Sequence, residues 1–473
     1  MVRLTIFTMK RFFLFFTLLA LLSSCGKDDE PKPEPTPNPP SQNDPDDPDD
    51  PDNENINITL APTTLSFEAQ GGTLDLTVTC TTGKTWTLSG GESWCTASGT
   101  NGSNGATVTF TAEANTSPDE RNATYTFTCG DKTAKLVVTQ KQQTVTTVHV
   151  PTKGTLASVL AENDLEASSI VLLKITGEIN DVDILTIQEM TNLMNLDISG
   201  INLTELPGSA FFGLKNLKKV VLPNILTSIG ERALPKNLQS IEIPASVETI
   251  GNNAFASCKN LTIVTFEKGS QLKTIGYSAF SNCTSLTSIE IPASVETIED
   301  DAFYACKALT IVTFEKGSQL KTIESAAFQA TALQSIEIPA SVETIEERAF
   351  EKCTALTTVT FEQGSRLKTI QGSISYLNSD GLSYTYYHGA FYNLPNLKTV
   401  DMSACTQVET IKVCAFGMCN IQVFKIGTIE PPKAQYSSVS TAAFSILKVP
   451  AESVEAYKKA EEWQRFSSIS ALD

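Results

Sequence analysis

"IEIPASVETI", residues 241–250, is a stretch that the chain repeats twice more without a change, from residues 289 and 336. A second string, "FEKGSQLKTI", alternates with it from residues 266 and 314, and returns as "FEQGSRLKTI" from residue 361. A reacting centre needs one asymmetric arrangement of groups, whereas a long regular surface uses the same unit many times. The repeats therefore predict a stacked, regular structure and argue against catalysis.

The identical strings belong to a longer ladder of apolar residues. Each rung has the form LxxΦxΦ, where Φ is apolar, as in "LQSIEI" from Leu238. The steps between rungs are 24, 21, 23, 25, 23, 24, 23, 41 and 24 residues, and all but one fall in the window of about 20–29 typical of leucine-rich repeats. Because one unit cannot bury its own apolar face, we expect short strands stacked into a solenoid. The rungs are Leu193, Leu217, Leu238, Leu261, Leu286, Leu309, Leu333, Leu356, Leu397 and Ile421.

The wording of the repeat is specific. The pattern IPxSVxTIxxxAFxxC is similar to the BspA-like branch of leucine-rich repeats, and the resemblance covers residues 193–446. Members of that branch are mostly surface proteins, which implies adhesion to host or microbial partners. Both ends of a solenoid need a cap. We expect a helix and a strand within residues 143–192 at the front, and Tyr457 and Trp463 within residues 447–473 at the back.

An alternating pattern precedes the repeats, over residues 58–142. Leu74, Leu76 and Val78 face one way while Asp75 and Thr77 face the other. This period of two, with glycine-rich breaks, predicts a β-sandwich. The string "LSFEAQGG", the two tryptophans and the final "LVVTQK" resemble the BACON domain of Bacteroidetes surface proteins, which implies an immunoglobulin-like sandwich that binds glycans or serves as a spacer.

Two questions stay open in this segment. Trp86 and Trp94 either stack on sugars or belong to the core, and the core interpretation is favoured in so small a sandwich. Cys80 and Cys129 either form a bridge or remain buried thiols. The fold class is therefore mainly β, with an immunoglobulin-like sandwich followed by a capped leucine-rich-repeat solenoid.

The amino-terminal residues predict an exported lipoprotein. A basic start and the apolar run "FFLFFTLLALL" end at "LSSC", so residues 1–24 are typical of a signal peptide. "LSSC" resembles a lipobox, which implies lipid attachment to Cys25. The following "GKDDE" resembles the export signal of Bacteroidetes surface lipoproteins and implies an outer-membrane protein that faces the cell exterior. Residues 25–57 are acidic and proline-rich, as in an extended linker.

Charge and cysteine usage exclude several classes of function. The net charge of −18 argues against nucleic-acid binding. The chain has no CxxC, and His149 and His388 are its only histidines, so we expect no metal site. It carries no GxSxG, GxGxxG, Walker loop or HExxH, and we expect no cofactor. Absence of these motifs does not by itself exclude an enzyme, but a solenoid on an extended linker argues against one. The cysteines that follow the Ala-Phe pairs alternate with Thr331 and Leu394, which indicates small buried positions.

Two sets of residues are candidates for ligand binding. Glu242, Glu290 and Glu337 point outward on alternate strands, about 9–10 Å apart. Their surroundings are equivalent, so they favour a solvated or mildly acidic docking face over an acid–base pair.

The second set lies in the one long step of the ladder, which exceeds the others by about sixteen residues. Its string "QGSISYLNSDGLSYTYYHGAF" forms either a recognition loop or an internally packed hairpin. Tyrosine supplies the rigid, amphipathic contact area that recognition surfaces use. The candidates in this loop are Tyr376, Tyr384, Tyr386, Tyr387 and His388.

Together these patterns predict a non-catalytic, lipid-anchored surface protein. It would bind a host or microbial surface protein or glycan through its leucine-rich-repeat surface. The alternative is a glycan-capture accessory protein of a polysaccharide-utilisation system, which would bind through the BACON-like domain.

Overall fold

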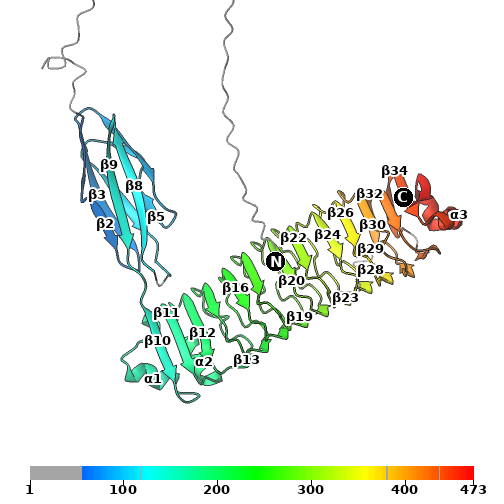
Figure 1. Cartoon of the computed structure of the whole chain (residues 1–473), viewed down its shortest axis with the longest axis horizontal. Coiled ribbons are helices and arrows are strands. Elements are labelled where there is room, and N and C mark those ends of the chain that lie inside the picture. Colours follow the sequence, from blue (N-terminus) through cyan, green and yellow to red (C-terminus); the bar gives the residue numbers. More distant parts are fainter. Residues whose placement is uncertain (1–55, 118, 380–381, 436, 473) are drawn as a thin grey trace, which may run out of the picture. The chain divides into compact units, whose positions relative to one another are not determined.

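The structure is a computed structural model, and it describes residues 56–117, 119–379, 382–435 and 437–472. Figure 1 shows a β-sandwich and a solenoid, each of which is described by itself. The predicted signal peptide, Cys25 and nearly all of the predicted linker lie outside the described residues. The described helices are all too short or too polar to cross a membrane.

The sandwich packs a four-stranded sheet on a five-stranded sheet. Trp86 is buried in its core and meets the Phe127 ring edge-on at 5.3 Å, which confirms the core interpretation for this tryptophan. Cys80 and Cys129 are free buried thiols, so no bridge forms between them. The first sheet has the order β1 (Ile58–Ala61), β3 (Gly72–Cys80), β7 (Ala106–Ala112) and β5 (Cys95–Ala97). The second has the order β2 (Thr64–Phe67), β9 (Lys132–Gln140), β8 (Arg121–Cys129), β4 (Thr85–Gly90) and β6 (Asn101–Ser103).

One face of the solenoid is a column of parallel strands, one per coil (Figure 1). Their burial alternates, as in the eBeB pattern of "SIEI" from Ser288, because period-two residues face the core in turn. All ten rungs of the predicted ladder are fully buried. The strands are β10 (Val145–Val150), β11 (Leu172–Gly177), β12 (Asn195–Ile201), β14 (Lys219–Val221), β16 (Ser240–Ile243), β18 (Ile263–Phe266), β20 (Ser288–Ile291), β22 (Ile311–Phe314), β24 (Ser335–Ile338), β26 (Thr358–Phe361), β30 (Thr399–Met402), β32 (Phe416–Ile426), β34 (Val439–Val449) and β35 (Ser468–Ala471).

A second column consists of two-residue strands, most of them Thr-Ile. The threonines and the isoleucines of neighbouring coils lie in register, for example Thr249 opposite Thr274 and Ile250 opposite Ile275. The strands are β13 (Glu205–Leu206), β15 (Ser228–Ile229), β17 (Thr249–Ile250), β19 (Thr274–Ile275), β21 (Thr297–Ile298), β23 (Thr322–Ile323), β25 (Thr344–Ile345), β27 (Thr369–Ile370), β31 (Thr410–Ile411) and β33 (Lys433–Ala434).

The phenylalanines of the Ala-Phe pairs form a continuous stack through the core. Neighbouring rings from Phe255 to Phe416 have centroids 4.7–5.4 Å apart and planes within 9° of parallel. Sheet strands set this spacing, because adjacent strands lie about 4.8 Å apart. The parallel stacking of the rings therefore follows directly from the identity of the repeats.

Two residues of each regular coil, two before and two after the stacked ring, adopt a left-handed backbone. In the coil of Phe303 these are Asp301 (φ 57°) and Ala305 (φ 55°). Such non-glycine residues are unusual. Each is held by a backbone bond to the next coil, as when Asp301 N–H donates to Ser325 O at 2.9 Å and Ala305 N–H to Gln329 O at 2.8 Å.

The cysteines three residues after each ring are buried, as the pattern predicts. Cys283 Sγ donates to Phe255 O and Cys306 Sγ to Phe280 O, both at 3.1 Å. Where a coil has Thr331 instead, its hydroxyl donates to Phe328 O at 3.0 Å. The thiols thus satisfy carbonyl groups of the coil wall.

Short helices lie at both ends of the solenoid. α1 (Leu156–Glu162), the short 3₁₀ segment η1 (Ala167–Ser169) and α2 (Asp181–Gln188) accompany the first coils. At the other end, Trp463 is buried against Phe424 and Tyr457, with ring centroids 5.9 and 5.3 Å away. The elements at that end are η2 (Ala451–Ser453), α3 (Val454–Lys459) and η3 (Glu461–Arg465).

Candidate functional site

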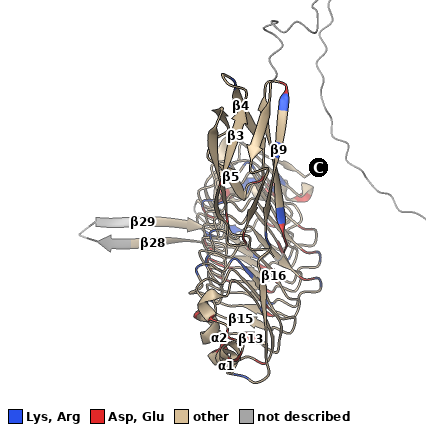
Figure 2. Ribbon diagram, turned by 90° about the vertical axis from the view of Figure 1, so that its left-hand side faces the viewer, with Lys and Arg blue, Asp and Glu red and all other residues tan. Residues whose placement is uncertain are grey.

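The long step of the ladder is a β-hairpin made of β28 (Gly372–Ser379) and β29 (Leu382–Gly389). It projects sideways from the solenoid (Figure 2). Its root, which we define as residues 371–373 and 388–390, explains why the insertion does not disturb the coils. In regular coils the alanine before the stacked ring donates its N–H three residues back, as Ala302 does to Glu299 O at 3.2 Å. Ala390 N–H donates to Gln371 O at 3.0 Å in the same way, although residues 372–389 now stand between them.

The hairpin is therefore an extension of a turn that every regular coil possesses. The two arms of that turn are already an antiparallel, hydrogen-bonded pair, so strands can continue them outward in register. The ladder of the hairpin begins with Gly372 opposite Gly389 and runs without a shift to Ser379 opposite Leu382. The excess length predicted from the sequence is accommodated entirely outside the coil.

The register divides the tyrosines between two faces of the hairpin. Tyr387 is paired with Ile374, and Tyr376 with Thr385, so Tyr376 and Tyr387 lie on one face. Tyr386 is paired with Ser375 and lies on the opposite face. Tyr376 is 67% exposed, and Tyr386 and Tyr387 are each 44% exposed.

Tyr384 is paired with Leu377 in the ladder, and its side chain lies outside the described part of the structure. The structure thus brings Tyr376 and Tyr387 together on one face, whereas Tyr386 lies apart from them. An internally packed hairpin does not describe these three exposed side chains.

His388 belongs to the root of the hairpin. Its side chain is 15% exposed, and its Nδ1 lies 3.7 Å from Oε2 of Glu351, which is 5% exposed. Lys352 Nζ lies 3.4 Å from the other oxygen of this carboxylate. Ser373 Oγ donates to Glu347, so both strands are tied to the preceding coil. His388 thus lies at the root beside Glu351 and does not extend the tyrosine surface.

An acidic patch borders this root, which the sequence analysis did not identify. We call it the acidic strip, and it occupies three consecutive coils before the hairpin. Burial, and then the neighbouring carboxylates, raise the pKa of Glu324 and of Glu346 above their ordinary values. The acidic strip is encoded in the strings "TIEDDAF", "TIESAAF" and "TIEERAF". Each of them places an acid directly after a Thr-Ile strand of the second column. The members of the strip are Glu299, Asp300, Asp301, Glu324, Glu346 and Glu347.

The predicted glutamates of the strand face are exposed on alternate strands. Glu242 lies opposite Thr265, Glu290 opposite Thr313, and Glu337 opposite Thr360. None of the three makes an ion pair with another described residue. Glu267 lines the same hollow as Glu242, and its carboxylate accepts from Ala245 N–H at 2.9 Å.

Ion pairs terminate this face at both ends. Lys425 Nζ lies 2.7 Å from Asp401 Oδ2, and Lys174 Nζ lies 3.0 Å from Asp197 Oδ2. Burial alone would raise the pKa of Asp401, but hydrogen bonds from Lys425 and Ser403 outweigh it and hold the pKa below its ordinary value. Between these two ion pairs, Lys219 lines the same hollow as Glu242.

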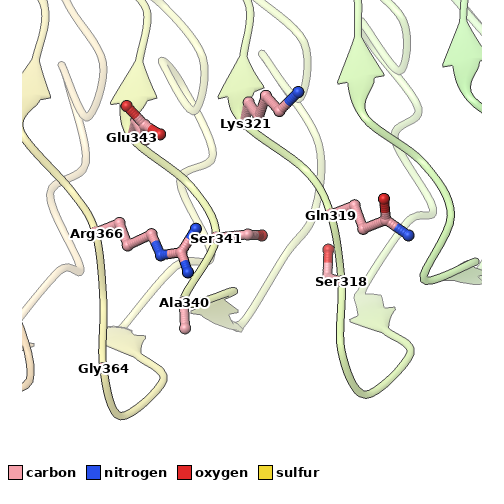
Figure 3. A pocket seen from close by; sticks show the side chains of 8 residues that line it. All are labelled: Ser318, Gln319, Lys321, Ala340, Ser341, Glu343, Gly364 and Arg366. Atoms are coloured by element: carbon pink, nitrogen blue, oxygen red, sulfur yellow. The ribbon is translucent and has the colours of Figure 1, made fainter.

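The surface of the solenoid has several open hollows. Figure 3 shows one of about 400 Å³, in which Lys321, Glu343 and Arg366 surround Ser341. It lies over the short turn of one coil, between the longer glycine-containing turns of its two neighbours. A second hollow, of about 400 Å³, lies on the strand face beside Glu242 and Ile263. Within the described residues, no group of three or more potential ligand side chains could hold a metal ion.

Comparison with known proteins identifies both folded segments. The family model of the BspA type leucine rich repeat region matches overlapping segments that together span residues 186–448. The model of the BACON domain, described as a putative binding domain, matches residues 84–141. A search of curated proteins finds no match.

Solved structures of bacterial leucine-rich-repeat proteins are similar at low identity. One from Bacteroides ovatus is 18% identical, with 74% of this chain and 90% of that chain covered and a TM-score of 0.34. The pneumococcal vaccine antigen PcpA is 18% identical, with 74% and 87% covered and a TM-score of 0.30. A leucine-rich cell surface protein of Faecalibacterium prausnitzii is 18% identical, with 59% and 88% covered and a TM-score of 0.29.

The family match spans more than half of the chain and coincides with the stacked coils. The ladder of buried leucines, the Ala-Phe pairs and the cysteine positions are the residues that carry it. The chain therefore belongs to the BspA-type leucine-rich-repeat family and also carries a BACON domain.

Proposed function

We propose that this protein is a non-catalytic, lipid-anchored protein of the outer bacterial surface that binds a host or microbial surface protein or glycan through its solenoid. The observation that carries the proposal is the projecting hairpin. It leaves the coils intact and exposes Tyr376, Tyr386 and Tyr387. Large exposed aromatic side chains on a firmly rooted projection have no role in packing the solenoid and suit recognition.

The strand face supports the proposal as a second contact area. Glu242, Glu290 and Glu337 repeat along a regular parallel sheet, and a long partner could contact several of them at once. The lipobox-like string before Cys25 and the acidic linker support anchoring that holds the folded segments away from the membrane.

A hairpin excision tests the proposal. Residues 372–389 are replaced by the dipeptide Ser–Ala, which stands at the corresponding place between Glu324 and Ala327. The full chain and this variant are compared on an array of glycans and extracellular-matrix proteins. We expect the variant to lose the ligand that the full chain binds.

Point variants then separate recognition by the hairpin tyrosines from a general effect of removing exposed tyrosines. Tyr376→Ala with Tyr387→Ala should weaken binding, whereas Tyr277→Ala with Tyr304→Ala should not. Tyr277 and Tyr304 are a matched control because they are exposed tyrosines on regular coils, 45% and 38% accessible. Binding that survives the hairpin excision would refute the assignment of the hairpin.

Anchoring has its own test. Mass spectrometry of the mature protein should detect a lipid on its amino terminus. A Cys25→Ser variant should lack this lipid. Brief protease treatment of intact cells should remove the folded segments of the parent protein. Resistance to that treatment would refute a location on the cell exterior.

The alternative function, glycan capture through the BACON domain, depends on its aromatic residues. Trp86 is buried, so Trp94 is the remaining candidate platform. The Arg121 guanidinium already lies over its ring, 4.5 Å from the centroid. Titration of residues 56–142 with mucin and plant glycans would show binding if this alternative holds.

A further inference from the structure

We propose that the β28 edge of the hairpin accepts a third β-strand from a partner polypeptide, an extended segment rich in Lys or Arg. The proposal rests on the proposed function, because it takes the hairpin as a binding element. It adds the class of partner, a protein rather than a glycan, and the mode of binding, which is backbone pairing.

The hydrogen-bond pattern shows which backbone groups are free. Because Ala390 N–H donates to Gln371 O, the bonded pairs of the ladder alternate outward from there. Ser373 with His388 and Ser375 with Tyr386 are then the bonded pairs. The N–H and C=O groups of Ile374 and Tyr376 must point away from β29, and they make no bond to any other described residue.

The two edges of the hairpin differ at the root. On β29 the outward carbonyl of Gly389 already accepts from Arg348 N–H at 3.2 Å. A strand added to the β29 edge could therefore not pair with Gly389, and its pairing would have to begin farther out along the hairpin. On β28 the outward groups of Ile374 and Tyr376 are free, and no bond from a neighbouring coil engages this edge at the root. The outward groups of Thr385 and Tyr387 on β29 are also free, but the bond at Gly389 obstructs that edge where it leaves the coil, so we take the β28 edge as the site of pairing.

The hairpin lacks the usual protection of an open edge. Natural edge strands carry lysines, prolines or bulges that prevent pairing with other chains. Residues 372–389 contain one aspartate and no lysine, arginine, glutamate or proline, and the ladder has no bulge. An isolated two-stranded hairpin is only marginally stable in water, and a third strand stabilises it.

Charge identifies the partner. The face of the hairpin that carries Ser373 and His388 contacts Glu347 and Glu351 of the preceding coil, so it points toward the acidic strip. Every second side chain of an added strand would face the same way. Basic side chains at those positions would relieve the repulsion that raises the pKa of Glu346, after burial, through its neighbours Glu347 and Asp300.

A second copy of the chain fits this surface poorly. It would bring its own acidic strip, and the chain carries a net charge of −18. Like charges across an interface oppose association. The partner that this edge favours is therefore a basic, extended segment of another protein.

The experiment titrates the full chain with capped octapeptides. The probe is an alternating lysine–threonine peptide, and its control has glutamate in place of lysine. A second control carries N-methyl groups on alternate residues, which removes the hydrogen bonds of one peptide edge and leaves the side chains. We expect the parent peptide to bind and both controls to bind about tenfold more weakly, which corresponds to about 1.4 kcal/mol. The methylated control loses backbone hydrogen bonds, and the glutamate control loses the attraction to the acidic strip.

Protein variants test the edge itself. Tyr376→Pro removes the outward N–H, which is no part of the hairpin ladder, and Tyr376→Val keeps it. We expect Tyr376→Pro to bind the peptide about tenfold more weakly than Tyr376→Val. Thr385→Pro, the same change on the β29 edge, should bind as the parent does. Circular dichroism of each variant checks that the solenoid remains folded.

The outcomes are distinguishable. Equal binding by Tyr376→Pro and Tyr376→Val would overturn strand addition, whereas the array ligand would still be lost on hairpin excision if the proposed function holds. Binding of the glutamate peptide as tightly as the lysine peptide would overturn the choice of a basic partner. Self-association in sedimentation, abolished by Tyr376→Pro and accompanied by no peptide binding, would overturn it in favour of a second copy.

Discussion

Substitution of Phe303 by alanine tests whether the aromatic stack stabilises the solenoid. Phe303 is completely buried, and its ring lies 5.2 Å from both Phe280 and Phe328, with planes 2° and 0° from parallel. Removing a buried phenylalanine costs about 3–5 kcal/mol, and each aromatic pair contributes about 0.5–1.5 kcal/mol beyond its buried area. Since two pairs are lost at once, we expect the free energy of unfolding to fall by an amount in the upper part of the ~3–5 kcal/mol range, about 4–5 kcal/mol.

Two matched variants isolate the role of the ring. Phe303→Leu retains most of the apolar volume and should cost about 1–2 kcal/mol. Tyr304→Ala changes the neighbouring exposed side chain and should stay within about 0.5 kcal/mol of the parent.

Chemical unfolding followed by circular dichroism measures these differences. Hydrogen exchange of the peptide that covers residues 297–309 is measured in parallel, because coils of a solenoid can unfold in part. The stack would have no special role if Phe303→Ala cost less than about 1 kcal/mol. The same conclusion would follow if alanine and leucine cost the same.

Further predictions concern the thiols, the carboxyl groups Glu324 and Asp401, and the hairpin. Burial raises the pKa of Cys353 to about 11 and that of Cys419 to about 12, so iodoacetamide at pH 8 should label neither thiol in the folded chain and both after unfolding; labelling of folded protein would contradict their burial. Because burial and neighbouring acids raise the pKa of Glu324 in the folded state, its charge destabilises the fold at neutral pH, and the penalty is relieved as the pH falls through the raised pKa to the ordinary carboxyl range. Glu324→Gln should therefore stabilise the protein at pH 7 and have no effect near pH 3. Asp401→Asn should cost stability at pH 7 and lose that cost at low pH, because the folded pKa of Asp401 is lowered. Unfolding curves of both variants and the parent at pH 7 and pH 3 test these expectations. Replacing residues 372–389 by Ser–Ala should leave the thermal unfolding midpoint of the solenoid within about 2 °C of the parent, since the Ala390 to Gln371 bond closes the coil in either case; a larger fall would show that the hairpin supports the coils.

The regular part of the fold was predictable from spacing alone. Apart from one step of 41, the rungs are 21–25 residues apart and carry leucine or, at the last rung, isoleucine. This spacing leaves one solution, in which every rung is buried, and all ten rungs are buried. The same logic placed the cysteines inside, because Thr331 and Leu394 share their position. It gave no indication that the thiols donate to carbonyls, since hydrogen-bond partners from other coils become neighbours only after stacking.

The candidate site was only partly predictable. The length and tyrosine content of the insertion identified it as an exception, but the division of Tyr376 and Tyr387 from Tyr386 depends on the register of the hairpin. The position of His388 beside Glu351 depends on a side chain of the preceding coil. The acidic strip is not apparent from the sequence, because its acids from successive coils are 22–25 residues apart and become neighbours only in the stack.

The sequence by itself determined that this protein is a solenoid, because identical units with one apolar face can bury it only against each other. It also determined where the symmetry is broken. Only the tertiary structure decided what the break presents to a partner. Which tyrosines share a face, which strand edge is open and which charges surround it are properties of neighbours in space. Those neighbours are set by hydrogen-bond register between segments that the order of residues keeps apart.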